Sequence, residues 1–275
     1  MSRLIRLDTD IDSAFVARAR QRALIEGRGP RVSEFFLNPY RFGGAGSTDP
    51  LYAQVALLLH MDGSNGGTTF TDNSPTPKTV TPTIVTTSTV QAKFGISSAL
   101  YPGASATQKL TIPHSADLAP TGDFCVEMWV RLGAAASQRC LIWKSVSTGH
   151  TTYAMRLTTT NTVQCFASNA AGSAFQINMT GTTAVNTSGT WQHIAFDRNG
   201  STYRLFIHGT LDTSASAAGA GYVNAAHSVT IGNVTDNTLP IGTGGNDSYI
   251  DDVRITTASR YTANFTPPSS PFPNS

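Results

Sequence analysis

Two short runs of residues joined by Asn199-Gly200 constrain the fold of this chain more than any other segment. In residues 191–197, one set of alternate positions holds Trp191, His193, Ala195 and Asp197. In residues 203–208, one set holds Tyr203, Leu205 and Ile207, and the other holds Arg204, Phe206 and His208. Alternation with a period of two is typical of a half-buried strand. Asn and Gly tolerate the positive φ angles that a tight turn between two strands requires. The segment therefore predicts a β-hairpin, with Trp191 mostly buried at its start.

Similar runs repeat from residue 51 onward, separated by clusters of Gly, Ser, Thr, Asn and Pro. The expected strands cover residues 55–61, 80–86, 109–112, 124–132, 140–144, 153–158, 163–167, 175–179, 191–197, 203–208, 228–232 and 249–256. This spacing of short strands is typical of a β-sandwich or barrel. In the run 124–132, the expected apolar face holds Phe124, Val126, Met128, Val130 and Leu132. The other face holds Cys125, Glu127, Trp129 and Arg131.

Six segments stand in the order in which they occur in one known family. They are residues 57–63, 93–101, 123–131, 189–209, 229–232 and 249–261. Two of them contain Trp-Gln-His-Ile-Ala at 191–195 and Tyr-Ile-Asp-Asp-Val-Arg-Ile at 249–255. Together the segments cover about residues 52–268 and resemble the laminin G-like domains of the concanavalin A-like lectin/glucanase superfamily. The resemblance implies an all-β fold, a jelly-roll β-sandwich.

The ending of the chain carries a second resemblance. Residues 260–268, Arg-Tyr-Thr-Ala-Asn-Phe-Thr-Pro-Pro, are similar to the ending of such domains in tailed-phage structural proteins. By this resemblance alone, we expect a virion protein made in the cytoplasm of a host bacterium. Two functions stay open: the sandwich binds a host-surface glycan or receptor, or it is a capsid or tail decoration or structural protein with no ligand of its own. A homo-oligomer is compatible with either function.

The chain divides near residue 50. Residues 1–27 hold apolar side chains at helical spacing, and Thr9 or Asp10 can cap a helix there. Residues 28–50 are rich in Gly and Pro, which is typical of a linker. We expect residues 1–50 to attach the sandwich of 51–275 to other virion proteins, and folding back onto that sandwich is the alternative. The expected attachment residues are Phe15, Phe35, Phe36, Tyr40 and Phe42.

Composition argues against several classes of protein. The formal charge is +2, and residues 51–275 hold eleven basic and eleven acidic residues, so a nucleic-acid partner is not expected. No run approaches the roughly eighteen apolar residues of a membrane helix, and no apolar signal-peptide core opens the chain. Cys125, Cys140 and Cys165 match no zinc spacing. We expect them to be buried free thiols, made in a reducing cytosol.

An enzyme is not expected. Glycoside hydrolysis needs two carboxyl groups about 5–10 Å apart, and the glucanases of the superfamily use a pair of Glu residues on one strand. Residues 51–275 contain a single Glu, Glu127, and the next acid along the chain is Asp197 on another expected strand. Asp251 and Asp252 are adjacent, so on a strand their side chains diverge. No Gly-x-Ser-x-Gly nucleophile elbow occurs.

A buried carboxylate is expected near the end of the chain. Asp251 falls on the same alternating face as Tyr249, Val253 and Ile255, and a carboxylate on an apolar face must be hydrogen-bonded or bound to a cation. In the domains that this chain resembles, acids at such positions help to hold a structural calcium ion. The corresponding residues are Asp62, Asp251 and Asp252, with Asp72 and Asn73 nearby. The favoured alternative is that Asp251 accepts backbone N–H groups.

A sugar site needs exposed aromatic faces beside polar groups. The candidates are Tyr153, Trp143, Tyr222 and Tyr249. The tryptophans expected in the core instead are Trp129, Trp143 and Trp191. Loops 167–174, 212–224 and 233–248 are rich in Asn, Ser, Thr and Gly, which either bond to sugar hydroxyls or form inert surface. The sequence therefore leaves the carbohydrate-binding residues unknown.

Overall fold

The computed structural model describes residues 48–145, 150–223 and 227–275. By its contacts the chain divides into two units, of which the second is Thr48–Ser275. The expected N-terminal helix lies outside the described residues, and so do the expected attachment residues Phe15, Phe35, Phe36, Tyr40 and Phe42. Among the described residues, no helix is long and apolar enough to cross a membrane.

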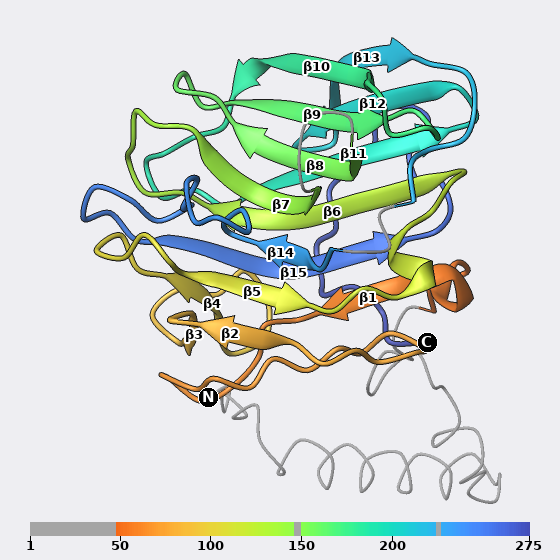
Figure 1. Cartoon of the computed structure of the whole chain (residues 1–275). Helices are drawn as coiled ribbons and strands as arrows, with labels where there is room; N and C mark the ends of the chain where they lie inside the picture. The colour runs from red at the N-terminus through yellow and green to blue at the C-terminus, as the bar shows by residue number, and fades with distance from the viewer. Residues whose placement is uncertain (1–47, 146–149, 224–226) are drawn as a thin grey trace, which may run out of the picture. The chain divides into compact units, whose positions relative to one another are not determined.

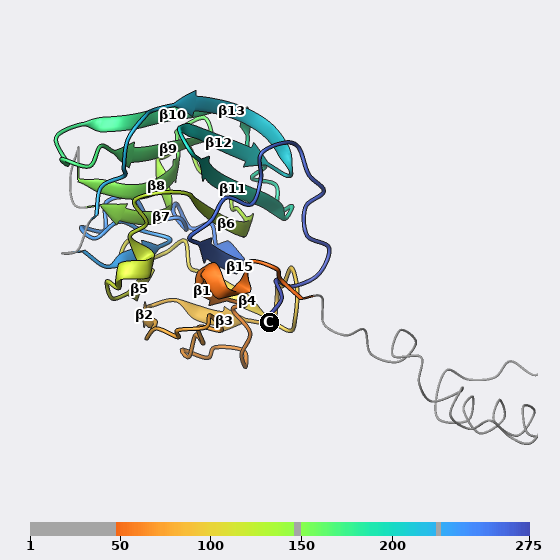
Figure 2. The ribbon, with the colours of Figure 1, turned by 90° about the vertical axis from the view of Figure 1, so that its right-hand side faces the viewer.

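The described unit is a sandwich of two antiparallel sheets, seen in Figure 1 and from the side in Figure 2. The front sheet, which faces the viewer in Figure 1, has the order β10 (Phe175–Ala184), β9 (Thr162–Ser168), β8 (Thr151–Leu157), β7 (Arg139–Ser145), β14 (Val229–Ile231), β5 (Lys109–Ile112) and β2 (Thr81–Thr83). The back sheet has the order β13 (Thr210–Ser216), β12 (Thr202–Ile207), β11 (Gln192–Asn199), β6 (Phe124–Arg131), β15 (Ser248–Thr256), β4 (Ser98–Tyr101) and β3 (Thr86–Ser88), and β1 (Val55–Leu59) also pairs with β15. Two short 3-10 helices are η1 (Tyr52–Gln54) and η2 (Ala116–Leu118). The predicted all-β sandwich is confirmed.

The main core lies between the two sheets and follows the predicted alternation. In and just after β6, the core-facing side chains are Phe124, Val126, Met128, Val130 and Leu132. Burial of one such side chain stabilises the fold by about 1.5–3 kcal/mol. The opposite face of β6 carries Cys125, Glu127 and Trp129, and these are buried as well. Their burial requires a further layer over the back sheet.

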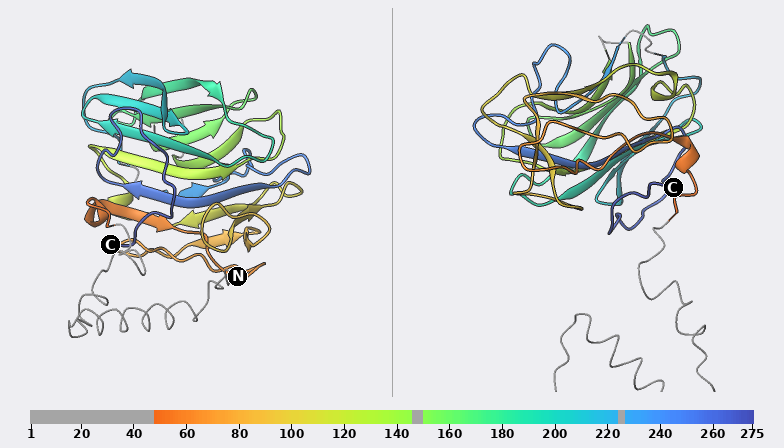
Figure 3. Two further views of the ribbon diagram at one scale, coloured as in Figure 1. Left: turned by 180° about the vertical axis from the view of Figure 1, so that it is seen from behind. Right: turned by 90° about the horizontal axis from the view of Figure 1, so that it is seen from below.

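That further layer is the C-terminal segment, residues 257–275, called the strap below. Figure 3 shows it from behind, crossing the outer face of the back sheet. Tyr261 and Phe265 stack with ring centroids 3.6 Å apart and pack on the cluster around Phe206 of β12. Near the end of the chain, Phe272 packs against β1. The protein's own chain therefore covers much of the outer face of the back sheet.

The predicted hairpin is present as β11 and β12, with its turn one residue later than expected. Asn199 pairs with Thr202, so Gly200 and Ser201 are the central residues of the turn, in place of Asn199 and Gly200. Gly200 has a φ of 59°, a left-handed conformation that glycine adopts without steric cost. The N–H group of Gly200 donates to Asp123 Oδ1 at 2.7 Å. This bond joins the turn to Asp123, the residue before the first residue of β6.

β15 departs from the predicted register at Asp252. A bulge follows Asp251, and Asp252 has a φ of 47°. The extra residue interrupts the alternation, so Ile250 and Val253 both face the core while Asp251 lies on the outer face. The expectation that Asp251 shares a face with Val253 and Ile255 is therefore wrong, because a bulge offsets one strand against its partner by a residue.

The three cysteines are buried and unpaired. Burial raises the pKa of each thiol, at Cys125, Cys140 and Cys165. A thiol that stays protonated is a poor nucleophile. These side chains therefore pack as small apolar groups.

Candidate functional site

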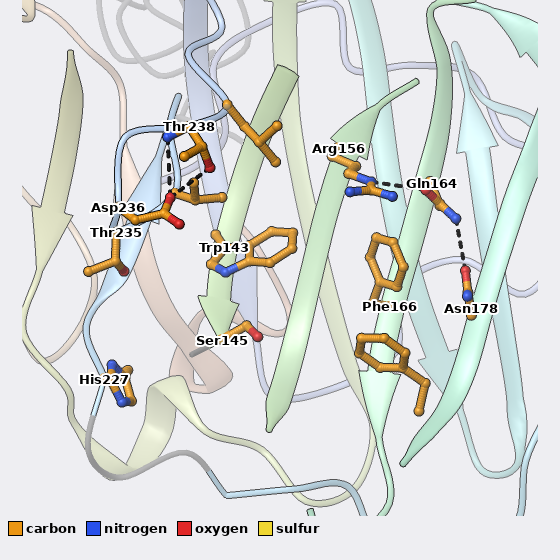
Figure 4. A pocket seen from close by; sticks show the side chains of 13 residues that line it. Trp143, Ser145, Arg156, Gln164, Phe166, Asn178, His227, Thr235, Asp236 and Thr238 are labelled. Atoms are coloured by element: carbon orange, nitrogen blue, oxygen red, sulfur yellow. Dashed lines mark hydrogen bonds between the residues drawn. The ribbon is translucent and has the colours of Figure 1, made fainter. Parts of the chain in front are cut away.

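A hollow of about 620 Å³ opens on the outer face of the front sheet, across β7 to β10 (Figure 4). It is called the Trp143 pocket below. The strands contribute Trp143, Ser145, Arg156, Gln164, Phe166, Phe175 and Asn178. The opposite wall is the segment around the loop after β14, with His227, Val234, Thr235, Asp236, Thr238 and Leu239. The pocket thus lies on the face that points away from the back sheet and its strap.

The strands direct these side chains outward because the core occupies the alternate positions. On β8, Tyr153 faces the core, so its neighbour Ala154 faces outward. The register places Trp143 of β7 opposite Ala154, and Ala154 opposite Phe166 of β9. Side chains opposite each other on paired strands have Cβ atoms about 4.5–5.5 Å apart. Strand pairing alone therefore sets the spacing of Trp143, Ala154 and Phe166.

Aromatic rings form the floor of the pocket. The ring centroid of Phe166 lies 6.1 Å from that of Trp143 and 5.1 Å from that of Phe175. The Trp143 and Phe166 rings meet edge to face at 66°, so neither ring covers the face of the other. Ala154 carries only a methyl group between them, and Trp143 is partly exposed. An exposed aromatic face of this kind accepts the apolar face of a ligand ring.

A row of planar polar groups lies beside the rings, as Figure 4 shows. Arg156 Nε donates to Gln164 Oε1 at 2.9 Å, and Gln164 Nε2 donates to Asn178 Oδ1 at 2.9 Å. The Arg156 guanidinium lies over Phe166, 5.0 Å from the ring centroid, which is a cation–π contact. Burial lowers the pKa of Arg156, but a guanidinium keeps its charge at neutral pH. The row therefore carries a positive charge, and its hydrogen bonds fix the orientation of its side chains.

The opposite wall is a loop braced by its own hydrogen bonds, residues 233–239. Asn233 is buried, and its Oδ1 accepts two backbone N–H groups of the loop. Lys109 Nζ donates to a loop carbonyl at 3.0 Å. The exposed Asp236 accepts the backbone N–H and the hydroxyl of Thr238 on Oδ1. A wall held in this way loses little freedom when a ligand binds.

Residues 104–263 match the family model described as the concanavalin A-like lectin/glucanases superfamily. The chain belongs to this superfamily. The matched range includes all four strands that line the Trp143 pocket. The family assignment made from the sequence is confirmed, and the tailed-phage association stays a prediction.

Solved structures share the superfamily fold at low sequence identity. The binding domain of Paraclostridial Mosquitocidal Protein 1 has a TM-score of 0.60 and 13% identity, covering 77% of this chain and 50% of that one. Botulinum neurotoxin type C, whose cell entry depends on interaction with two ganglioside molecules, has a TM-score of 0.55 and 13% identity, covering 77% and 49%. The binding domain of botulinum neurotoxin DC in complex with rat synaptotagmin II has the same TM-score and identity, covering 77% and 50%. The chain spans about half the length of these structures, and the likeness shows the fold alone. A search of curated protein sequences finds no match.

In this member of the superfamily, Glu127 belongs to a buried cluster of charges. Arg254 donates to Oε1 from Nε at 2.8 Å and lies 2.7 Å away with Nη2. His193 Nε2 lies 3.1 Å from Oε2, and the Tyr261 hydroxyl donates to it at 2.8 Å. Burial alone would raise the pKa of Glu127, but Arg254 and His193 outweigh it and hold that pKa well below its usual value. Glu127 therefore stays ionised inside the protein, on the sheet opposite the Trp143 pocket.

The expected metal ligands accept hydrogen bonds from the chain itself. Asp251 Oδ2 accepts the backbone N–H groups of residues 93 and 94, at 2.7 and 3.1 Å. Asp62 and Asp72 accept backbone N–H groups in the same way, and Asp252 accepts one from the strap. Among the described residues, no group of three or more His, Cys, Asp and Glu side chains is placed to hold a metal ion. The residues do not fit the calcium site that the resemblance implies, because in the described part of the chain these acids are not gathered into one set of ligands.

The aromatic residues that the sequence suggested for sugar binding lie in different environments. Trp143 lines the pocket. Tyr153 belongs to the main core and Tyr249 is 8% exposed, so neither offers a ring face. Tyr222 is partly exposed and meets His150 edge to face, but it does not line the pocket.

The three tryptophans expected in the core also differ in their burial. Trp129 is 1% exposed, as predicted. Trp143 and Trp191 are both partly exposed and belong to no core cluster, so the placement in the core is wrong for them, although Trp191 is mostly buried as predicted. The reason is local: β7 turns Trp143 to the outer face, and Trp191 lies just before the first residue of β11.

Sequence reasoning missed the partners of Trp143 in the pocket. They are Arg156, Gln164, Phe166, Phe175 and Asn178. The alternation in residues 153–158 and 163–167 is a signal that could have placed Arg156 and Gln164 away from the core-facing positions. What it could not give was their adjacency, which depends on the pairing of β8 with β9.

Proposed function

We propose that this chain is a non-enzymatic binding module that takes a saccharide into the Trp143 pocket. The pocket combines a partly exposed indole ring with guanidinium and amide groups (Figure 4). A saccharide presents the two matching surfaces, since its C–H faces pack on aromatic rings and its hydroxyls bond to planar polar groups. The ligand expected from the resemblance is a glycan or receptor on the surface of a host cell.

The observation that carries the proposal is the surroundings of Trp143. A single exposed aromatic side chain would be ordinary. Here the ring borders a hollow, its neighbour Ala154 leaves room beside it, and the row from Arg156 to Asn178 is fixed next to it by hydrogen bonds. A small number of polar groups around an apolar floor is typical of a small-ligand site.

The acids of the described residues support a role without catalysis. Asp236 is the one carboxylate among the described residues that line the pocket, whereas glycoside hydrolysis needs two. Glu127, the single Glu of residues 51–275, is paired with Arg254 on the other sheet. A hydrolytic pair at the Trp143 pocket is therefore not supported.

Proteins of similar fold give a further reason to propose binding. One of these is a neurotoxin whose cell entry depends on two ganglioside molecules. Others are botulinum neurotoxin DC binding domains in complex with SialylT and with rat synaptotagmin II. The likeness supports binding as the class of function, and the pocket chemistry supports a saccharide as the ligand.

A glycan array probed with the full chain tests the proposal. We expect at least one class of saccharide to bind, and Trp143→Ala to weaken that binding about tenfold or more, through the lost ring contact and its buried area. Trp191→Ala is the matched control, because Trp191 is also partly exposed but lies outside the pocket. It should bind as the unchanged protein does.

Two outcomes contradict the proposal. One is the absence of any bound saccharide, and the other is unchanged binding by Trp143→Ala. Either result would favour the alternative, a decoration or structural protein with no ligand of its own.

We further propose that the module is part of a tailed-phage virion, with residues 1–50 attached to other virion proteins. The support is the resemblance of residues 260–268 to the endings of such proteins. An antibody against the sandwich should label assembled particles, and deletion of residues 1–50 should abolish the label. Particles that carry no label from the complete chain would overturn this part of the proposal.

A further inference from the structure

Arg156 is a cation without an acidic partner. Its Nε binds Gln164 and its guanidinium stacks on Phe166, but among the described residues neither Nη atom has a hydrogen-bond partner and no carboxylate lies within ion-pair distance. Arg254 and Arg260 differ in this respect, because both pair with Asp49. A half-buried guanidinium with free Nη atoms at a pocket can accept a carboxylate or phosphate as its partner.

The hydrogen bonds along the polar row fix which groups stay free. An arginine Nε–H can only donate, so Gln164 must turn its oxygen toward Arg156. The Gln164 amide nitrogen therefore faces Asn178 and must meet the oxygen of that side chain. In the part of the chain that the structure describes, each amide oxygen already accepts one bond inside the row. Free N–H donors remain on all three side chains.

A row of free donors selects a ligand that brings acceptors. Neutral sugar hydroxyls can accept hydrogen bonds, but a carboxylate accepts two parallel bonds from one guanidinium and carries the opposite charge. Across the pocket, Asp236 supplies an acceptor for hydroxyl groups and makes no ion pair with Arg156 in the described residues. The two walls therefore differ in what they recognise.

We propose that the Trp143 pocket binds an acidic saccharide, with a sugar ring against Trp143 and its carboxylate on the Nη atoms of Arg156. This inference rests on the proposed saccharide-binding function and adds the charge of the ligand. The Gln164 and Asn178 amides donate to neighbouring ring or hydroxyl oxygens. Asp236 accepts hydroxyls from the far side of the ring.

The test is an array that carries oligosaccharides containing uronic acids, each beside its carboxyl-reduced counterpart. The full chain should bind acidic members at least about tenfold more tightly than their reduced counterparts, since a hydrogen bond to a charged group contributes that much or more. Arg156→Gln should remove this preference, so that each acidic member binds about as tightly as its reduced counterpart. Arg156→Lys keeps the charge but not the planar fork, so its preference should fall between the two.

A matched control removes a cation from the other sheet. Arg131→Gln alters the net charge as Arg156→Gln does, but Arg131 ends β6 and contacts Tyr249. It should keep the preference for acidic members. Added salt should weaken binding of the acidic members more than of the reduced ones, because screening acts on the charge pair.

The outcomes separate this inference from the function on which it rests. Equal binding of acidic and reduced members, lost in Trp143→Ala, keeps the saccharide site and overturns the acidic ligand. A preference that survives Arg156→Gln overturns the role of Arg156. Binding of no saccharide overturns both proposals together.

Discussion

Arg254 reaches Oε1 of Glu127 with both Nε (2.8 Å) and Nη2 (2.7 Å), beneath the strap on the back sheet. The same guanidinium reaches Asp49 with Nη1 at 2.9 Å and lies over the ring of Phe272, 3.8 Å from its centroid. One buried arginine therefore joins β6 to the segment before β1 and to the strap. When one member of a buried ion pair is removed, its partner is left as an unpaired charge.

Glu127→Gln should destabilise the protein by about 3–5 kcal/mol, the usual effect of breaking a buried pair. Gln has the shape of Glu but cannot balance Arg254. Urea unfolding measures the change. Asp236→Asn is the control, because this acid is exposed, and its effect should stay within about 0.5 kcal/mol. Equal effects of the two substitutions would contradict a special role for the buried pair.

The same carboxyl group should make the fold sensitive to acid. The pKa of Glu127 is below its reference value of 4.5 in the folded protein, so the unfolded chain binds a proton at higher pH than the folded one. Its stabilisation is present above pH 4.5 and is lost as the pH falls toward the folded-state pKa. Between pH 6 and pH 3, the free energy of unfolding should fall less in Glu127→Gln than in the unchanged protein. Parallel curves would assign the acid effect to other groups.

Residues 48–50 should matter for stability, although residues 1–47 should not be needed for folding. Asp49 pairs with Arg254 and Arg260 and donates its N–H to the Ser275 carbonyl. The fragments 48–275 and 51–275 should both melt cooperatively, with the shorter one at a lower temperature. A hydrogen bond to a charged group contributes about 1.5–3 kcal/mol, and each kcal/mol corresponds to roughly 2–4 °C in a domain of this size.

Asp49→Asn in the longer fragment is the control for this comparison. It keeps the chain length and removes the charge, so it should lower the melting temperature in the same direction. If both fragments are insoluble, residues 1–47 are part of the fold and the prediction is wrong.

The tryptophans provide a test of burial. Trp129 is 1% exposed and contacts Phe94 and His193, so Trp129→Ala should cost about 3–5 kcal/mol. Trp191 is partly exposed, and Trp191→Ala should cost closer to 1 kcal/mol. Thermal melts of the two variants decide the order. The reverse order would mean that Trp191 is covered in solution.

Most of the longer strands were predictable from the alternation of the sequence, whereas the short β3 and β4 and the polar β13 were not. The alternation placed residues 109–112, which are β5, and it gave both faces of β6. β13 was missed because its residues, Thr-Leu-Asp-Thr-Ser-Ala-Ser, are mostly small and polar and none is buried. The bulge at Asp252 was missed because it depends on how β15 pairs with its neighbours, which no local pattern encodes.

The Trp143 pocket was predictable only in part, for a related reason. Outward positions on β8 and β9 follow from alternation, but a pocket requires the register that aligns Trp143, Ala154 and Phe166 across three strands. Its other wall comes from residues 233–239, far along the chain. The strap presents the same difficulty, because nothing local in residues 257–275 indicates which face they cover.

Because of Asp251, the free energy of unfolding should fall as the pH rises. A chelator should leave this free energy unchanged. Burial raises the pKa of Asp251 to about 8, against a reference value of 3.8, because the three N–H groups that it accepts only partly offset the loss of water. The folded state therefore holds a proton that the unfolded chain releases. The stabilising effect is complete below about pH 4 and is lost as the pH rises through 8.

Asp251→Asn cannot titrate, so its free energy of unfolding should vary less between pH 5 and pH 8 than that of the unchanged protein. The slope should shrink without vanishing, because the pKa values of Asp252 and His60 nearby are also raised. Burial raises the pKa of Asp252. Burial alone would lower the pKa of His60, but its hydrogen bonds to Asp252 and Asn274 outweigh that effect and raise this pKa. Urea unfolding at both pH values, with and without EDTA, measures these effects. A chelator that lowers stability, with recovery on added calcium, would show that a cation displaces the N–H groups now bound to Asp251 and would restore the metal site expected from the family resemblance.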